Sequence, residues 1–246
     1  MFKSTADEQV SVSDAPLAPA VVTVGLDFIY QPQTLHIQAL RQVNWDVPRG
    51  IVQMIMGPAG AGKTTLLMIL AGLLTPTDGQ VNLLGQTITH MSRQQLTQFR
   101  LRHIGMLFQE ANLLAALTAL ENVEVAVRLK GVRGPAIRKT ATELLDAVGL
   151  GDRTKHLPHQ LSGGQQSRLS IARALAGQPD LLIADEPTAA LDAENGQIVI
   201  KLLRQLATEH RCSVILATHD HRITGFADRI AYLEDGCLTD QPSVAV

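Results

Sequence analysis

A glycine-rich segment at residues 57–64 constrains the fold of this 246-residue chain more than any other feature. It reads GPAGAGKT and matches the pattern G-x-x-x-x-G-K-[ST], with an apolar run before it and a leucine-rich stretch after it. Glycines let backbone amides close around phosphate oxygens, and the N-terminus of a following helix adds further amides and a favourable dipole. Lys63 can supply a charge to the β- and γ-phosphates, and the Thr64 hydroxyl can ligate Mg²⁺. The segment predicts a strand–loop–helix unit that binds a nucleoside triphosphate.

Three apolar runs predict buried parallel strands. Residues 51–56, 181–184 and 214–217 lack clean alternation, which is typical of strands covered by helices on both faces. Helical patterns lie between them, so the chain is expected to form an α/β fold with a largely parallel sheet.

Helix signals are also clear. We expect a helix over residues 64–74, with Leu66, Leu67, Leu70 and Leu73 on one side. Two capping boxes, Ser92-x-x-Gln95 and Thr118-x-x-Glu121, open further helices, and others are expected over about 136–148 and 194–208. The stretch from about 110 to 168 has no convincing strand and is interpreted as a helical insert.

Composition excludes several classes of protein. The net charge of -2 and the aromatic content of 3% argue against nucleic acid as a partner. Cys212 and Cys237 are too few for a disulfide framework and fit a reducing compartment. Without an 18-residue apolar run or a signal-like N-terminus, a cytoplasmic location is expected. We expect tails at residues 1–20 and 241–246 and one ordered domain over 21–240.

A second predicted anion site lies at the start of another helix. In the sequence LSGGQ, Ser162 can cap the helix while Gln165 stands at the capping-box position. Gly163 and Gly164 leave the amides of the first turn bare, so this N-terminus can also meet an anion. A well-capped helix start without a ligand is the alternative.

Two carboxylates, Asp185 and Glu186, end the apolar run at residues 181–184. The ends of parallel strands are where α/β sheets place ligands. One carboxylate can hold a metal shell while the other polarises an attacking water, a division that suits phosphoryl transfer. A solvated acidic turn before Pro187 is the alternative.

The phosphate loop and LSGGQ together make residues 21–238 resemble the ATP-binding-cassette (ABC) ATPase family. The resemblance implies a P-loop NTPase fold: a RecA-like core with a mainly parallel sheet, an antiparallel β subdomain, and an α-helical subdomain at about 110–168. It implies ATP and Mg²⁺ as cofactors. It also implies a head-to-tail homodimer in the ATP-bound state, in which Ser162 and Gly164 of one chain contact the γ-phosphate held by the other.

Residue roles follow from the same resemblance. It implies the catalytic residues Glu186, His219 and Gln109, and the metal-site residues Thr64, Gln109 and Asp185. The nucleotide-binding residues that it implies are Tyr30, Gly57, Pro58, Ala59, Gly60, Ala61, Gly62, Lys63, Thr64, Thr65, Ser162, Gly163, Gly164, Gln165 and Asp192. Asp192 lies in a D-loop, Ala190-Leu191-Asp192, that reaches across the dimer. Tyr30 would stack on adenine, although Phe28 alternates with it and is the other choice.

The chain departs from the family pattern at three alanines. Ala59 and Ala61 stand in the phosphate loop where serine is frequent, and Ala189 stands before the D-loop where serine is common. The loop positions act mainly through backbone amides, so we expect function to survive, while Ala189 could tune coupling within the dimer.

Two further stretches indicate a branch of the family. Residues 103–123, HIGMLFQEANLLAALTALENV, resemble the lipoprotein-release and macrolide-export branch, with Ala115 in place of a frequent proline. Residues 218–236 resemble cyanobacterial DevA-type exporter ATPases.

The function that these resemblances imply is the ATP-hydrolysing subunit of an ABC exporter. It would lie on the inner face of the plasma membrane and drive a separate permease, joined in this branch to a membrane-fusion protein and an outer-membrane channel. The apolar stretch around Leu113, Leu114 and Leu117 is the expected permease surface. The alternatives are a mechanotransmitting ATPase that regulates a membrane partner without transport, and a soluble ABC protein acting on DNA or ribosomes. The single cassette, the absence of zinc-spaced cysteines and the low basic charge weaken the last of these.

Overall fold

The computed structural model describes residues 18–30, 36–189, 191–210 and 212–242. Residues 1–17 and 243–246 of the expected tails, and Ala190 of the expected D-loop, lie outside the described residues. The strands are β1 (Val21–Tyr30), β2 (Ile37–Val47), β3 (Val52–Met56), β4 (Asp78–Leu83), β5 (Gln86–Thr87), β6 (Ile104–Leu107), β7 (Leu181–Asp185), β8 (Ser213–Thr218), β9 (Arg229–Glu234) and β10 (Cys237–Pro242). The α-helices are α1 (Lys63–Leu70), α2 (Arg93–His103), α3 (Ala119–Leu129), α4 (Ala136–Ala147), α5 (Gly163–Ala174) and α6 (Ala193–His210).

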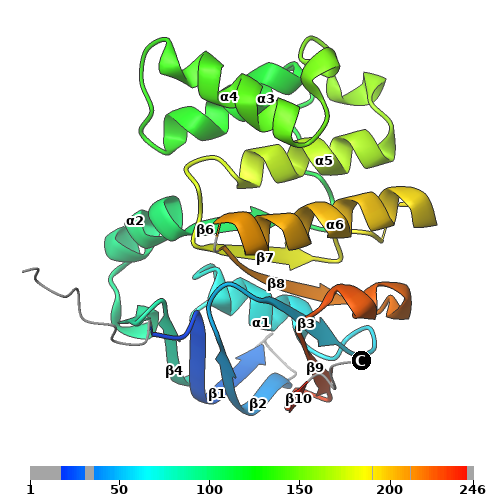
Figure 1. The fold of residues 1–246 in the computed structure, drawn as a ribbon. Helices are drawn as coiled ribbons and strands as arrows, with labels where there is room; N and C mark the ends of the chain where they lie inside the picture. The colour runs from blue at the N-terminus through cyan, green and yellow to red at the C-terminus, as the bar shows by residue number, and fades with distance from the viewer. Residues whose placement is uncertain (1–17, 31–35, 190, 211, 243–246) are drawn as a thin grey trace, which may run out of the picture.

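A six-stranded sheet forms the centre of the molecule, with strand order β10-β9-β3-β8-β7-β6. The pairs from β9 to β6 are parallel, and β10 joins β9 as an antiparallel hairpin. The three expected strands are therefore confirmed as β3, β7 and β8. A second sheet, β2-β1-β4-β5, is antiparallel throughout and lies beside the first (Figure 1).

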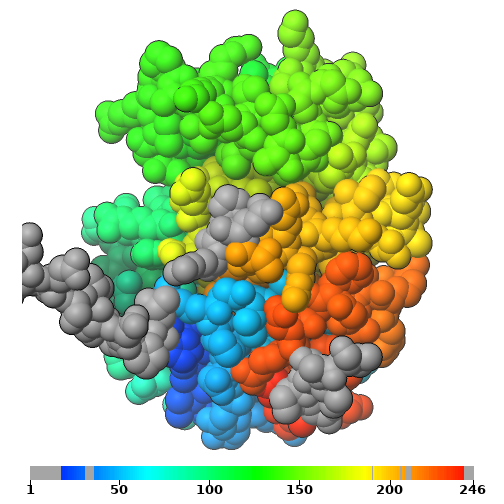
Figure 2. Space-filling view, in the orientation of Figure 1, coloured from blue at the N-terminus to red at the C-terminus, as the bar shows by residue number. Residues whose placement is uncertain are grey.

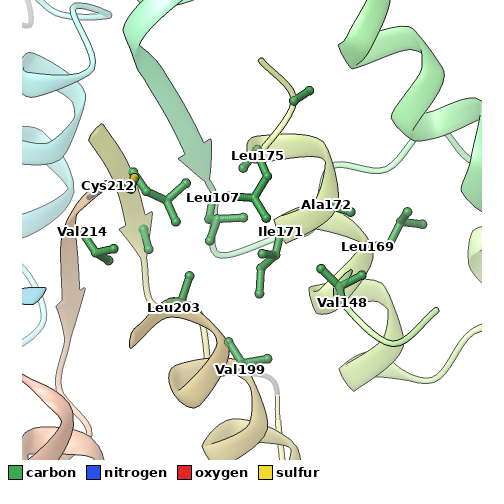
Figure 3. Close-up of a cluster of buried hydrophobic side chains, with 14 of the residues drawn as sticks. Leu107, Val148, Leu169, Ile171, Ala172, Leu175, Val199, Leu203, Cys212 and Val214 are labelled. Atoms are coloured by element: carbon green, nitrogen blue, oxygen red, sulfur yellow. The ribbon is translucent and has the colours of Figure 1, made fainter. Parts of the chain in front are cut away.

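The central sheet is buried on both faces, which explains the continuous apolar runs. Met54 and Met56 of β3 belong to a core that includes α5 and α6, whereas Ile55, between them, belongs to a core with α1 and the antiparallel sheet. Figure 3 shows Leu107, at the end of β6, directed toward Ile171 and Leu175. Burying each such side chain contributes about 1.5–3 kcal/mol of hydrophobic stabilisation.

The helical insert is confirmed. Between β6 and β7 the described residues form helices, turns and loops but no strand. Helices α3 and α4 pack together and lie at the end of the molecule away from the antiparallel sheet (Figure 1). In the space-filling view they form a layer of their own above the core (Figure 2).

The hydrogen bonds expected at the starts of three helices are present. Ser92, Thr118 and Ser162 each cap their helix, and the matching glutamine or glutamate completes the capping box. None of the helices in the described ranges is long and apolar enough to cross a bilayer.

One expectation about the first helix is wrong. Helix α1 ends at Leu70, so Leu73 lies beyond it and is 46% exposed, unlike the buried Leu66, Leu67 and Leu70. Gly72 follows the helix with φ +64°, and Leu73 N–H turns back to the carbonyl of Met68 at 2.8 Å. A left-handed glycine with this hydrogen bond is a common helix stop, and it interrupts the leucine periodicity.

Candidate active site

Four parallel strands end at the same edge of the central sheet, and each is followed by a polar segment. The phosphate loop follows β3, Gln109 lies two residues after β6, Glu186 follows β7, and His219 follows β8. Because the carboxyl ends of parallel strands share one edge, these four segments meet there although they lie far apart in the sequence.

The phosphate loop depends on glycine at its junction with α1. Gly62 is the N-cap of α1 with φ +104°, and a Cβ at this position would lie 2.3 Å from the carbonyl oxygen of Ala39. Only glycine tolerates both the dihedral angle and the approach of the neighbouring strand. The glycine at position 62 is therefore required by its contact with β2.

Lys63 lies across this loop. Its side chain is largely enclosed, and its ammonium donates to the carbonyls of Gly57 at 2.7 Å and Pro58 at 3.0 Å. The loop thus holds a positive charge next to its backbone amides, and this combination favours the binding of phosphate oxygens.

Thr64 and Asp185 provide a candidate metal site. Thr64 Oγ1 donates to Asp185 Oδ2 at 2.8 Å, while Asp185 Oδ1 is buried without a hydrogen-bond partner in the described residues. Burial raises the pKa of Asp185, helped by the charge of Glu186 and opposed by the Thr64 hydrogen bond and Lys63. An enclosed carboxylate with an unused oxygen beside a hydroxyl fits Mg²⁺, which takes few protein ligands when phosphates supply others.

Glu186 and His219 form a pair above the metal site. His219 Nδ1 lies 2.8 Å from Glu186 Oε1, and the glutamate side chain is 12% exposed. Glu186 has φ +48°, and its N–H donates to the carbonyl of Ala217 at 2.9 Å. A non-glycine residue in this conformation is uncommon and is often found at functional sites. The backbone here turns the carboxylate out of the sheet and toward the cleft.

A cleft of about 410 Å³ joins these groups. It is lined by Tyr30, Ile37, Ala39, Ala59, Gly60, Gly62, Lys63, Thr64, Thr65, Gln109, Asp185, Glu186 and His219. Gly57, Pro58 and the buried Ala61 belong to the loop behind this lining. With a phosphate-binding cation, a metal-type carboxylate and a second carboxylate that can orient water, the cleft is suited to hydrolytic phosphoryl transfer.

The structure distinguishes the two aromatic candidates. Phe28 is 8% exposed, whereas Tyr30 is 42% exposed and lines the cleft. The two rings meet edge to face at 4.8 Å, and Tyr30 Oη lies 3.1 Å from Thr65 Oγ1. Ile37, 48% exposed, lies in the same lining and was not foreseen. Ile37 is the partner of Tyr30 across the antiparallel strands β1 and β2, so a prediction of that strand pairing could have indicated it.

The LSGGQ segment lies outside this cleft. Ser162 and Gln165 exchange hydrogen bonds at the start of α5, with Gln165 N–H donating to Ser162 Oγ at 3.3 Å and Ser162 N–H to Gln165 Oε1 at 2.9 Å. Gly163 lines a neighbouring hollow of about 290 Å³, together with Gln109 and Glu186. The capped helix start expected from the sequence is therefore formed, and within one chain it lies outside the cleft.

Asp192 also lies outside the cleft, just before α6. Its carboxylate accepts from the N–H of Asn195 at 2.9 Å and from Asn195 Nδ2 at 2.8 Å, and these bonds lower its pKa. Asn195 also packs on Gly164, where a Cβ would lie 2.4 Å from its Oδ1. Asn195 thus links the D-loop to LSGGQ and was missed, although Asp-x-x-Asn at a helix start is a recognisable cap.

Comparison with known proteins gives a consistent result. The ABC transporter family model matches residues 40–189. The ABC transporter ATP-binding protein MJ1508 of Methanocaldococcus jannaschii is 46% identical over 202 residues, which are 82% of this chain and 90% of that protein. The macrolide export ATP-binding/permease protein MacB of a Shewanella species is 41% identical over 209 residues, 85% of this chain but 32% of MacB.

A solved structure is similar over nearly the whole chain. The ATP-binding cassette MJ0796 of Methanocaldococcus jannaschii, dimeric and bound to ADP and Pi in a post-hydrolysis state, matches with a TM-score of 0.85 at 38% identity. The match covers 92% of this chain and 100% of that one. The α/β P-loop NTPase fold expected from the sequence is thereby confirmed.

Proposed function

This chain belongs to the ABC transporter family and is an ATPase, and from this premise we propose that it powers a separate membrane permease through a dimer that closes on ATP. One observation carries the proposal: the cleft gathers a complete hydrolytic set, while LSGGQ, a second anion-binding helix start, lies outside it. Two copies arranged head to tail would let each supply what the other lacks. The dimeric structure of the similar cassette MJ0796, bound to ADP and Pi, supports a dimer as the working state.

In the proposed mechanism, Tyr30 and Ile37 hold the base, and the amides of residues 57–65 with Lys63 hold the phosphates. Thr64, Asp185 and Gln109 would hold Mg²⁺, which would supply positive charge to neutralise the phosphates. Glu186 orients and polarises the attacking water, and His219, hydrogen-bonded to Glu186, contacts the γ-phosphate side. Ser162, Gly164 and Asp192 act from the second chain.

Shared active sites lead to a mixing experiment. Lys63→Ala and Ser162→Arg each disable both sites of their own homodimer. In a mixed dimer both lesions fall in one interface and the other site is intact, so mixing two inactive variants is expected to restore part of the hydrolysis rate. Steady-state ATPase assays at varied mixing ratios, with heterodimers verified by two affinity tags, provide the measurement.

The control for this experiment is a mixture of Lys63→Ala with Glu186→Gln. Both residues line the cleft of a single chain, so each substitution damages the same half of the shared site. That pair leaves no intact site in either interface and should not recover. Equal absence of recovery in both mixtures, despite demonstrated heterodimers, would contradict the arrangement in trans.

The proposed permease surface lies on the loop before α3. Leu114 is 42% exposed, whereas Leu113 and Leu117 are half-buried and Leu113 packs against the core. The buried Asn122 holds this loop: its Nδ2 donates to the carbonyls of Leu114 at 3.1 Å and Leu117 at 3.0 Å. A rigidly held, exposed leucine near Gln109 is suited to anchor a short amphipathic helix.

We therefore expect Leu114→Asp to abolish co-purification of the permease while ATP binding remains. Val24→Asp is the matched control, because Val24 is 57% exposed but lies on β1 of the antiparallel sheet, away from the helical insert. Co-purification followed by mass spectrometry and nucleotide binding by fluorescence give the two readouts. Survival of the complex in Leu114→Asp and in Leu117→Asp would place the docking surface elsewhere.

We further propose that the partner is an exporter, with a membrane-fusion protein and an outer-membrane channel, and that this chain lies peripherally on the cytoplasmic face of the membrane. The similarity to MacB supports the export branch, and the DevA-type resemblance of residues 218–236 makes an amphiphilic cargo the most suitable class. Mass spectrometry of the co-purified membrane protein, followed by a transport assay, tests this against regulation without transport.

A further inference from the structure

A small pocket of about 170 Å³ lies at the outer edge of the central sheet, away from the nucleotide cleft. It runs beside β6, the last strand in the sheet order, and is closed by residues of α3 and α5. Its lining includes Phe108, Asn112, Lys130 and Arg173. None of the roles proposed above uses Lys130 or Arg173.

Both cations in this pocket are partly buried, and both have carbonyl partners. Lys130 Nζ donates to the carbonyl of Ile104 at 3.1 Å, and Arg173 Nη1 donates to the carbonyl of Asn112 at 2.7 Å. No ion pair among the described residues includes either of them. Burial lowers the pKa of each group, which is the direction expected for an enclosed charge without a counter-ion.

Local structure alone does not require two charges here. A neutral amide could donate to the Ile104 carbonyl equally well, and even a partly buried charge loses hydration that a counter-ion can offset. Arg229 of this chain illustrates the paired arrangement, since it contacts both Asp46 and Asp240. The pocket is therefore complementary to a carboxylate, and no aspartate or glutamate is among the described residues that line it.

The surroundings of the pocket indicate where that carboxylate comes from. Phe108, in the lining, is 37% exposed, and Leu114, two residues beyond Asn112, is 42% exposed. Asn112 itself has φ +46°, so the chain turns sharply between the pocket and the leucine. Exposed apolar groups beside unpaired cations fit an amphipathic protein segment with an acidic residue better than a free anion.

We propose that this pocket receives an aspartate or glutamate side chain from the segment of the membrane partner that docks beside Leu114, with Lys130 and Arg173 as its counter-ions. The inference rests on the proposed function and adds the chemistry of the partner segment. It makes the pocket a specificity determinant, because a permease without the acidic residue would leave two enclosed charges unpaired.

A photo-cross-linking experiment tests this on the complex purified from its own membranes. Phe108 is replaced by benzoylphenylalanine, which keeps an aromatic group in the pocket lining, and the cross-linked partner peptide is sequenced by mass spectrometry. The expected peptide carries Asp or Glu within one helical turn of the cross-linked residue. Changing that acid to Asn or Gln, or changing Lys130→Gln, is expected to weaken the complex by about tenfold or more, the scale of a charge-assisted hydrogen bond.

Lys130→Gln retains a donor for the Ile104 carbonyl, and Lys139→Gln is its control, because the Lys139 side chain is 79% exposed on α4. The ATPase rate of the isolated chain is expected to be unchanged in both variants. The decisive variant is Lys130→Glu, which should lose the complex and regain it when the partner's acid is changed to Lys.

A cross-linked segment without an acidic residue overturns the inference, as do equal affinities for Lys130→Gln and Lys139→Gln or a failed charge swap. In those cases ATP hydrolysis and the complex itself would persist, so the proposed function would stand. Loss of ATP-driven dimerisation, or absence of any membrane partner in the wild-type preparation, would instead contradict the proposed function.

Discussion

Replacing Lys63 with alanine is expected to abolish ATP hydrolysis. The ammonium is held at the carbonyls of Gly57 and Pro58, at the mouth of a cleft that also contains Asp185 and Glu186. Removing one group that stabilises transition-state charge commonly lowers the rate constant by ~10²–10³-fold. Binding should weaken as well, because the same charge meets the β- and γ-phosphates in the ground state.

Two measurements separate this effect from misfolding. The thermal unfolding midpoint without nucleotide should be close to that of the wild type, whereas the upward shift produced by Mg-ATP should be lost. Lys139→Ala, on the exposed face of α4, should behave as wild type in both. Normal ATPase activity in Lys63→Ala would remove the basis for assigning the cleft.

The second large effect is expected for Glu186→Gln. In the wild type, His219 Nδ1 lies 2.8 Å from Glu186 Oε1. The amide of the variant keeps the size of the side chain and can still pair with His219, but it cannot polarise water as strongly. Turnover should fall by ~10²–10⁴-fold, the range for a general base. ATP should still bind, because the phosphate loop and Asp185 are untouched, so the ATP-bound dimer should accumulate.

Size-exclusion chromatography with Mg-ATP measures that dimer directly. Glu186→Gln should elute as a dimer with ATP and as a smaller species without it, while Glu143→Gln, on the exposed surface of α4, should turn over normally. Double substitution with Ser162→Arg should return the trapped species to monomer. A Glu186→Gln protein that binds ATP yet remains monomeric at every concentration would argue against the dimer that closes on ATP.

Local signals in the sequence were sufficient for most of the fold. The capping boxes at Ser92, Thr118 and Ser162 formed as expected because they depend on residues only three positions apart. The apolar runs at β3, β7 and β8 predicted buried parallel strands for a similarly simple reason. A strand covered by helices on both faces is apolar at successive positions, and such a run is visible in the sequence. The prediction that Leu73 lies on the buried side of α1 was wrong, because the left-handed Gly72 ends the helix earlier than the leucine periodicity implied.

Residues whose role depends on a distant neighbour were less accessible. The cap formed by Asp192 and Asn195 is local, but the contact of Asn195 with Gly164 depends on folding. The position of Ile37 beside Tyr30 in the cleft lining depends on folding as well. Lys130 and Arg173 lie 43 positions apart in the sequence and share a pocket only because α3 and α5 close on the edge of β6. No local sequence pattern predicts that these two side chains lie in the same pocket.

The sequence by itself determined the candidate groups: a phosphate-loop motif, two adjacent carboxylates at the end of a buried strand, and a capped helix start at LSGGQ. Each of these needs particular residue types at short spacing, which a sequence displays directly. Tertiary structure decided which of these groups meet. Parallel pairing brought the ends of β3, β6, β7 and β8 to one edge, so residues far apart in the chain line one cleft. It exposed Tyr30 and buried Phe28, and it kept LSGGQ out of the cleft. These outcomes follow from strand order and packing, which are properties of the assembled sheet and of no single segment.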